Sequence, residues 1–246
     1  MASIMYAKFL QSSMFPAIHE LKSNFSDAFV FYRPKDFVSG DFYWYYHKAN
    51  LSVFAVADCT GHGVPGAIVS VICENALRNA VKECNFHNPA RILSNTNERV
   101  VEFFSQSQKS IHDGMEIALA VFDHQTMEID FCGANLPLYY TRNGKVVKLK
   151  PDIYRIGWDA KQLIFSNQRV KLAKDDLIFA FTDGFPDQFG AEEAGKKFSS
   201  ARLKNLLSEN QHQPYTYIEQ VLAYTFDQWR GANEQTDDVL VMGIKV

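Results

Sequence analysis

Apolar, strand-like runs that adjoin aspartates are the feature that most constrains how this chain folds. The runs 51–57 and 176–182 stop at Asp58 and Asp183, and the runs 42–46 and 239–246 follow Asp41 and the pair Asp237 and Asp238. An acidic residue at the edge of a buried strand costs free energy unless it is paired or coordinated. If the strands are neighbours in the fold, these carboxylates meet at one edge of the core.

Carboxylates gathered in this way favour a divalent cation. They repel one another, and their pKa values rise unless a cation neutralises them. Oxygen ligands without a cluster of histidine or cysteine select Mg²⁺ or Mn²⁺, and two such ions about 3.5–4 Å apart bind a phosphoryl oxygen and activate a water. A single aspartate at a strand end is more often a turn former. The hypothesis therefore depends on the recurrence and on the neighbouring Gly40, Gly61 and Gly184, which let a ligand approach closely.

The periodicities of the chain predict an α+β fold. Helical spacing covers residues 3–13, 67–81, 89–107, 199–210 and 214–230. Strand patterns lie around Phe29 and Phe31 and over residues 42–46, 51–57, 116–123, 126–132, 138–141, 145–149, 163–172, 176–182 and 239–246. Asn143 and Gly144 predict a hairpin. Antiparallel hairpins outnumber strand–helix–strand units, which favours layered α+β structure over a doubly wound sheet.

Composition narrows the classes of function. A net charge of −3 without a basic stripe argues against a nucleic-acid partner. The four cysteines match no zinc spacing and indicate reduced thiols, as in a cytoplasmic protein. No apolar stretch is long enough to span a membrane, although the parent chain might carry an anchor. The chain opens on helical residues, so we expect a segment of a larger protein, with a regulatory or linker-derived helix over 1–20 and the main domain over 21–246.

Five motifs occur in an order that resembles one protein family. They are Ser39-Gly40-Asp41, Asp58-Cys59-Thr60-Gly61-His62-Gly63, Asp113-Gly114-Met115-Glu116, Thr182-Asp183-Gly184 and Thr236-Asp237-Asp238. The set resembles the SpoIIE/RsbU-like branch of the PPM serine/threonine phosphatases and spans nearly the whole chain. Ser39 is a departure, because the family usually has Gly-Gly-Asp at this point. The resemblance implies an αββα sandwich, in which two antiparallel sheets pack face to face between helices.

The resemblance also implies roles for individual residues. Asp58 is similar to the ligand that bridges two Mn²⁺ or Mg²⁺ ions, and the backbone carbonyl of Cys59 to a further ligand. Asp183 and Asp237 are similar to ligands of the second ion. Asp41 is similar to the acid that holds water coordinated to the metal, directly or through hydrogen bonds. Asp41 and Asp58 are therefore the predicted catalytic residues.

Four further residues are weaker candidates for the site. Asp113 fits a third, weaker metal position and a plain turn aspartate equally well. Asp238 is expected to support the ligands, and Gly184 to give close access beside Asp183. His62 is either a general acid, because histidine titrates near neutral pH, or a residue that shapes its glycine-rich loop. We favour the second interpretation of His62.

The resemblance implies a protein phosphatase specific for phosphoserine and phosphothreonine. Its substrate would be a phosphorylated regulatory protein of the STAS, anti-anti-sigma type in a bacterial signalling circuit, and its parent chain would carry an upstream sensor. The apolar stripe of the N-terminal helix fits packing on its own domain, an upstream coiled coil or a homodimer. Two alternatives stay open, namely a catalytically silent interaction module and a hydrolase of small phosphoesters.

Overall fold

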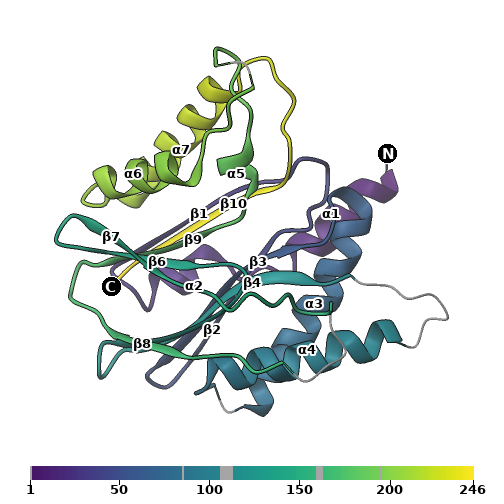
Figure 1. The fold of residues 1–246 in the computed structure, drawn as a ribbon, viewed down its shortest axis with the longest axis vertical. Coiled ribbons are helices and arrows are strands. Elements are labelled where there is room, and N and C mark those ends of the chain that lie inside the picture. The colour runs from purple at the N-terminus through teal and green to yellow at the C-terminus, as the bar shows by residue number, and fades with distance from the viewer. Residues whose placement is uncertain (1, 85, 106–112, 159–162, 194) are drawn as a thin grey trace.

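Ten strands form two five-stranded antiparallel sheets in the computed structural model, which describes all residues except 1, 85, 106–112, 159–162 and 194. The first sheet has the order β1 (Asp27–Arg33), β10 (Val239–Lys245), β9 (Leu177–Phe181), β6 (Leu138–Arg142) and β7 (Lys145–Leu149). The second has the order β2 (Phe42–Lys48), β3 (Leu51–Cys59), β4 (Met115–Asp123), β5 (Glu128–Ala134) and β8 (Gln168–Lys171). The sheets pack face to face, so the predicted sandwich is confirmed (Figure 1).

Helices cover the two outer faces of the sandwich (Figure 1). The second sheet is covered by α3 (Gly63–Glu83) and α4 (Pro89–Ser105), and the first by α6 (Ser200–Asn210) and α7 (Tyr215–Arg230). The remaining helices of the described residues are α1 (Ala2–Ser12), α2 (Ile18–Lys22) and α5 (Gly184–Asp187). Three apolar clusters follow from this layering, one between the sheets and one under each pair of helices.

The central strands read as continuous apolar runs because both of their faces are buried. In β3, Phe54 and Val56 lie in the cluster between the sheets, whereas Val53 and Ala55 lie in the cluster beneath α3 and α4. Successive side chains of a strand point to opposite faces. The alternation therefore decides which residues at the strand ends face the interior of the sandwich.

The predicted strand over 163–172 is wrong in its first part, because β8 spans only Gln168–Lys171. Leu163 and Phe165 instead insert as buried side chains into the cluster beneath α3 and α4. Side chains satisfy parts of this backbone in place of a strand partner, since Ser94 Oγ donates to the Leu163 carbonyl at 3.3 Å and the Ser166 amide donates to Asp152 Oδ2 at 2.8 Å. The alternating apolar residues Leu163 and Phe165 therefore pack into the core without forming backbone hydrogen bonds of a β-ladder.

The longer helices begin and end close to the predicted residues, except at the start of α3. Helix α3 begins at Gly63 rather than at 67, and it holds Pro65 in its first turn, where a missing N–H has no helical partner to lose. The short helices α2 and α5 were not predicted because a single turn leaves no periodic pattern. Asn88 caps α4, since its Oδ1 accepts from the Arg91 amide at 3.1 Å.

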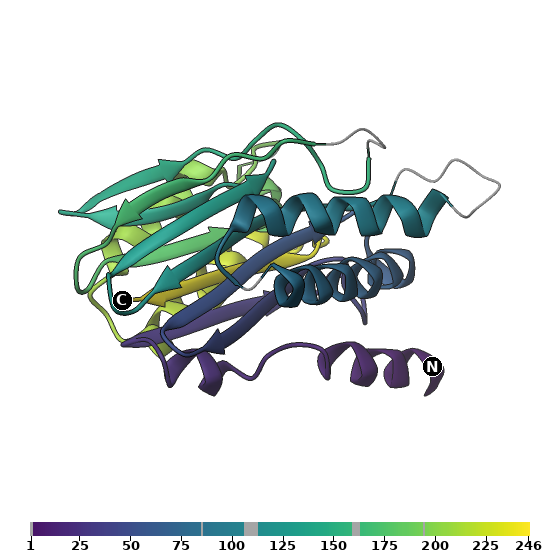
Figure 2. The ribbon, with the colours of Figure 1, turned by 90° about the horizontal axis from the view of Figure 1, so that it is seen from below.

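Helix α1 lies along the outside of the molecule beside α3 (Figure 2). Its apolar residues face outward, and Phe9 is 66% exposed. Gln11 is its buried residue, and the Gln11 amide donates to the Ser39 carbonyl at 2.6 Å and to Ser70 Oγ at 3.0 Å, while Gln11 Oε1 accepts from the Ser39 amide at 3.0 Å. One side chain thus joins α1 to the loop that precedes Asp41. Among the described residues, no helix is long and apolar enough to cross a membrane.

Candidate active site

Strand alternation brings acidic residues from both sheets to one end of the sandwich. In β3, Asp58 has the same parity as Phe54 and Val56 and therefore points toward the space between the sheets. Glu116 at the start of β4 pairs in register with Asp58, so the two side chains are neighbours on the same face. From the opposite sheet, Asp183 follows β9 and Asp237 precedes β10. The expected convergence of strand-end acids is the geometry found here.

These residues line a cavity of about 190 Å³. Its wall consists of Asp58, Cys59, Thr60, Gly61, Met115, Glu116, Arg155, Trp158, Asp183 and Asp237. Four of these residues are carboxylates and one is a guanidinium. The wall is therefore strongly acidic.

The carboxyl groups of the wall lie close enough to shift one another's pKa values. Burial raises the pKa of Asp58 well above its usual range, and the nearby charges of Asp183 and Asp237 raise it further. Burial together with the charges of Asp237 and Asp187 raises the pKa of Asp183 to about 6. Hard divalent cations prefer all-oxygen donors of this kind. The carboxylates line the wall rather than meet at one point, since no three His, Cys, Asp or Glu side chains within the described ranges are close enough to hold a single ion.

Asp41 belongs to the same group but is buried behind the cavity wall. It is 2% exposed, and its Oδ2 accepts a hydrogen bond from Thr182 Oγ1 at 2.6 Å. Its backbone is fixed as well, because the Asp41 amide donates to Ser39 Oγ at 3.0 Å. Burial and the charge of Asp58 raise the pKa of Asp41 well above its usual value. The structure thus places Asp41 beside Asp58 but outside the residues that line the cavity.

Asp238 connects the loop after β1 to the start of β10. Its Oδ1 accepts from the Lys35 amide at 2.7 Å and its Oδ2 from the Gly40 amide at 2.8 Å. Both carboxylate oxygens are therefore engaged by backbone amides, as expected of a supporting residue. Gly184 packs against the backbone of Asp238 so closely that a Cβ at position 184 would lie 1.9 Å from the Asp238 carbonyl oxygen. Only glycine fits at this position without moving the backbone of Asp238.

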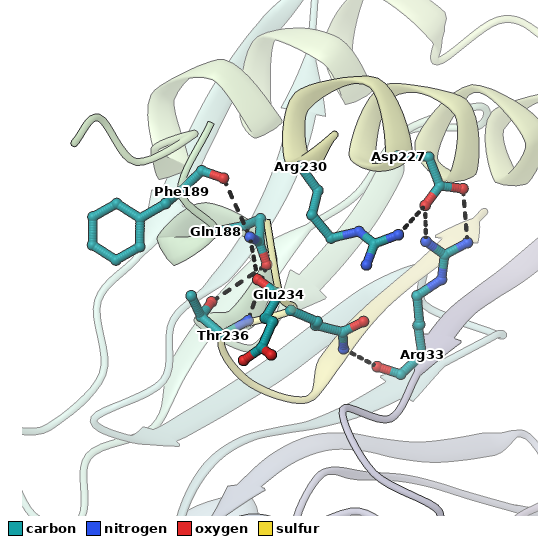
Figure 3. Close-up of polar contacts among 8 residues, drawn as sticks. Arg33, Gln188, Phe189, Asp227, Arg230, Glu234 and Thr236 are labelled. Atoms are coloured by element: carbon teal, nitrogen blue, oxygen red, sulfur yellow. Dashed lines mark hydrogen bonds and ion pairs between the residues drawn. The ribbon is translucent and has the colours of Figure 1, made fainter. Parts of the chain in front are cut away.

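A buried glutamine holds the loop that carries Asp237. Gln188 Nε2 donates to the Glu234 carbonyl at 3.0 Å, and Gln188 Oε1 accepts from the Thr236 amide at 3.0 Å (Figure 3). Gln188 is fully buried, so these hydrogen bonds are shielded from water. The position of Asp237 thus depends on a side chain for which the sequence offered no signal.

Arg33 forms an ion pair away from the acidic cavity. The residue ends β1, and its guanidinium pairs with Asp227 of α7 through Nη1–Oδ1 at 2.5 Å and Nη2–Oδ2 at 3.2 Å (Figure 3). Arg230 lies 3.7 Å from the same carboxylate. Arg33 therefore fastens α7 to the first sheet and does not line the acidic cavity.

His62 lies beside the acidic cavity without forming part of its wall. His62 Nδ1 is 3.0 Å from Asp36 Oδ2, and His62 Nε2 is 2.9 Å from Lys35 Nζ. The Lys35 ammonium and the Asp36 carboxylate therefore contact the two ring nitrogens of His62 from opposite sides. This arrangement ties the glycine-rich loop to residues 35–36, which agrees with the loop-shaping interpretation.

Asp113 and Cys59 contribute differently from the aspartates of the wall. Asp113 precedes Gly114, whose carbonyl accepts from the Thr60 amide at 3.0 Å, and it does not line the described cavity. The Cys59 thiol is buried in the cluster beneath α3, where burial and the neighbouring Cys73 raise its pKa. The part of Cys59 that adjoins the cavity is therefore its backbone.

Sequence reasoning missed Glu116 and Arg155 as residues of the wall. Glu116 had a signal, because it is acidic and lies at an inward-facing position of a strand paired with the strand of Asp58. Arg155 had none, because it lies in an irregular segment and reaches the cavity only through tertiary contacts.

The four-layer sandwich, with an acidic cavity at one end of its sheets, is the architecture of the PP2C-type phosphatase domains. The family model described as Stage II sporulation protein E (SpoIIE) matches residues 49–246, and the chain therefore belongs to the SpoIIE family. The match begins after Asp41, so the place of Asp41 is supported here by structure alone. Comparison with curated protein sequences gives no match.

Solved structures share the fold. The SiaA-PP2C domain of Pseudomonas aeruginosa is 29% identical with a TM-score of 0.90, and the match covers 100% of this chain and 96% of that one. The PP2C phosphatase domain of SpoIIE from Bacillus subtilis, with a fragment of its regulatory domain, is 17% identical with a TM-score of 0.71 and coverages of 89% and 62%. A Mycobacterium tuberculosis structure of RsbU and RsbW domains is 19% identical with a TM-score of 0.70 and coverages of 89% and 59%. The chain thus spans about three fifths of the last two.

Proposed function

We propose that this chain removes phosphate from phosphoserine and phosphothreonine in a protein, by hydrolysis that depends on Mn²⁺ or Mg²⁺. The observation that carries the proposal is the acidic wall, in which four carboxylates from both sheets line one cavity and the pKa values of Asp58 and Asp183 are raised by their neighbours. Such a wall favours cations that bring a dianionic phosphate to it.

The residues that would hold the cations are Asp58, the Cys59 carbonyl, Asp183 and Asp237, for two ions. Asp113 is a candidate for a third, weaker position. When bound, the cations polarise the phosphoryl oxygens and lower the pKa of water. The donor set fits them, because it is composed of oxygen atoms and its carboxylates raise one another's pKa values. A magnesium complex of RsbX, which shares the fold at a TM-score of 0.59, is consistent with this choice of ion.

Asp41 is suited to hold a water molecule at the site, directly or through hydrogen bonds. It is buried beside Asp58 and behind the cavity wall. The Thr182 hydroxyl at 2.6 Å fixes its Oδ2. Asp238 and Gly184 fix the backbone on either side of the site, which keeps the acids in place without contacting the substrate.

The proposed substrate is a phosphorylated regulatory protein of the STAS, anti-anti-sigma type, and the proposed context is a longer chain with an upstream sensor. Two of the structures with this fold concern RsbU with RsbW domains and the bacterial stressosome, which supports a signalling role. In this context residues 1–20 would be the regulatory segment and 21–246 the phosphatase domain, with the exposed apolar face of α1 as a surface for a homodimer.

Phosphate release from a phosphoserine protein and from p-nitrophenyl phosphate tests the proposal. With Mn²⁺ present, we expect turnover of both, with a higher kcat/KM for the phosphoprotein. Faster turnover of the small ester would favour the hydrolase of small phosphoesters. Absence of divalent-cation binding in calorimetry at millimolar metal would favour the silent interaction module.

Replacing His62 with alanine is expected to change kcat by less than about threefold. A general acid contributes about 10²–10⁴-fold, whereas His62 is engaged between Lys35 and Asp36 and is outside the cavity wall. Steady-state kinetics with a phosphoserine peptide would measure this, with His87→Ala as a matched histidine control. A loss of a hundredfold or more would assign His62 to the chemistry.

Replacing Gln11 with alanine is expected to lower kcat by about fivefold, because it leaves the buried Ser39 amide without its side-chain acceptor, at a cost of about 1–3 kcal/mol, and so loosens the loop before Asp41. Amide exchange should become faster in α1 and in the loop before Asp41. Ser12→Ala is the control, since the Ser12 hydroxyl bonds to the Phe9 carbonyl of its own helix. Faster exchange in α1 with unchanged kcat would show that α1 does not act on the site.

A further inference from the structure

Arg155 is held at the cavity by its own backbone neighbours. The next residue, Ile156, exchanges two hydrogen bonds with Met115 at the start of β4, both at 3.0 Å. One residue further, the Gly157 amide donates to the buried Asn97 side chain of α4 at 2.9 Å. The segment that carries Arg155 is thus fixed against the strand that carries Glu116.

The guanidinium of Arg155 is oriented by two residues of the same wall. Arg155 Nη2 lies 2.6 Å from Glu116 Oε1, and the guanidinium carbon lies 4.8 Å from the centre of the Trp158 ring. Glu116 is itself fixed, because its Oε1 also accepts from Asn135 Nδ2 at 2.6 Å. Glu116 pairs in register with Asp58, so this arrangement places the positive charge next to the carboxylates.

We propose that Arg155 binds the phosphoryl group of the substrate, with Glu116 and Trp158 as the residues that position it. Arg155 is the one cationic residue of the described wall. Its five N–H donors match phosphate oxygens in a bidentate manner, and its Nη2 lies against Glu116 Oε1. Its side chain is 44% exposed, so a substrate can reach it from solvent. The proposal rests on the proposed function, because it assigns the phosphate of that reaction.

Other basic residues near the site are engaged elsewhere. Lys197 contributes positive charge near Asp183, but its Nζ pairs with Asp187 at 2.6 Å and it does not line the cavity. Lys35 contacts His62, and Arg33 pairs with Asp227. The acidic wall alone repels a phosphate dianion. A fixed guanidinium on that wall gives the phosphoryl oxygens a partner and so favours productive binding.

The test compares Arg155→Gln and Arg155→Lys with the unaltered chain. Loss of charge-assisted hydrogen bonds to phosphate is expected to lower kcat/KM for a phosphoserine peptide by about 10- to 100-fold in Arg155→Gln. The inhibition constant for inorganic phosphate should rise by a similar factor. For Arg155→Lys, both constants should lie between those of Arg155→Gln and the unaltered chain, because an ammonium keeps the positive charge but lacks the planar guanidinium geometry. Mn²⁺ binding in calorimetry should be unchanged in both variants.

Arg169→Gln is the matched control, because Arg169 is also an arginine paired with a carboxylate, Asp130 at 2.7 Å, on a strand outside the cavity wall. The inhibition constant of the Arg169→Gln variant for inorganic phosphate should equal that of the unaltered chain. An unchanged affinity of Arg155→Gln for inorganic phosphate would overturn the assignment, even if turnover fell.

If the unaltered chain released no phosphate, the proposed function would fail. Calorimetry with inorganic phosphate and the Mn²⁺-loaded proteins would still decide the role of Arg155. If Arg155→Gln failed to fold, a phosphate affinity of Arg155→Lys equal to that of the unaltered chain would overturn the assignment.

Discussion

Replacing Asp58 with asparagine is expected to lower the rate of phosphate release by a factor on the order of 10³. Asp58 has acidic neighbours from both sheets. Glu116 pairs with it in register, and the charges of Asp183 and Asp237 raise its pKa. The amide of asparagine removes the negative charge that a pair of cations would share. Asp183→Asn should act in the same direction. Steady-state kinetics with Mn²⁺ at saturating phosphoserine peptide would measure both.

The fold of the Asp58 variant should survive, and this separates loss of chemistry from loss of structure. Without cations, the Asp58 carboxylate is buried among like charges and destabilises the folded state. Asp58→Asn should therefore unfold at the same temperature as the unaltered cation-free protein or above it. Asp130→Asn is the control for a carboxylate outside the cavity, and it should keep full activity. Substantial turnover by Asp58→Asn would refute the metal mechanism.

Removing divalent cations with EDTA is expected to abolish turnover and to lower the Tm at pH 7.5. Cations at a hundred times their Kd stabilise a folded protein by about 2.7 kcal/mol, which corresponds to about 5–10 °C for a domain of this size. The difference in Tm with and without Mn²⁺ should shrink at pH 5.5. Differential scanning fluorimetry at the two pH values would measure it.

The sign of this pH dependence follows from Asp183. Its pKa is about 6 in the folded protein and 3.8 as the ordinary value, so the folded state holds the proton more tightly. The stability of the cation-free protein therefore rises as pH falls through about 6, by about 1 kcal/mol once solvent screening of this partly exposed group is considered. Protons then neutralise the wall in place of cations. Equal cation-induced shifts at both pH values, or turnover that survives EDTA, would contradict the prediction.

The strand ends could be predicted from the sequence, because apolar runs indicate which strands are buried and the alternation of side chains indicates which face each residue occupies. A dense apolar run that stops at Asp58 or Asp183 places the acid at the edge of the core, and parity decides that Asp58 points between the sheets. The layered fold followed from the hairpins and, more fully, from the family resemblance. Asp238 and His62 each hold a backbone or loop segment in the structure, and their part in the reaction stays a prediction.

The remainder of the site could not be predicted because it depends on which segments meet in space. Gln188 and Arg155 lie in irregular segments whose local sequence has no period. Arg33 precedes a polar turn, and only the docking of α7 supplies its partner Asp227. The predicted strand over 163–172 failed for a related reason, because Leu163 and Phe165 alternate to fill a core and not to form a ladder.

The position of β10 has a consequence for how the site is assembled during synthesis. This strand lies between β1 and β9 and is the last strand of the chain, and the two residues before it are Asp237 and Asp238. A nascent chain that ends before residue 237 has the facing edges of β1 and β9 without a partner, and it lacks the carboxylate that fixes the Gly40 amide. Closure of the first sheet and completion of the acidic wall are thus one event. Phosphatase activity can then appear only after β10 has emerged from the ribosome.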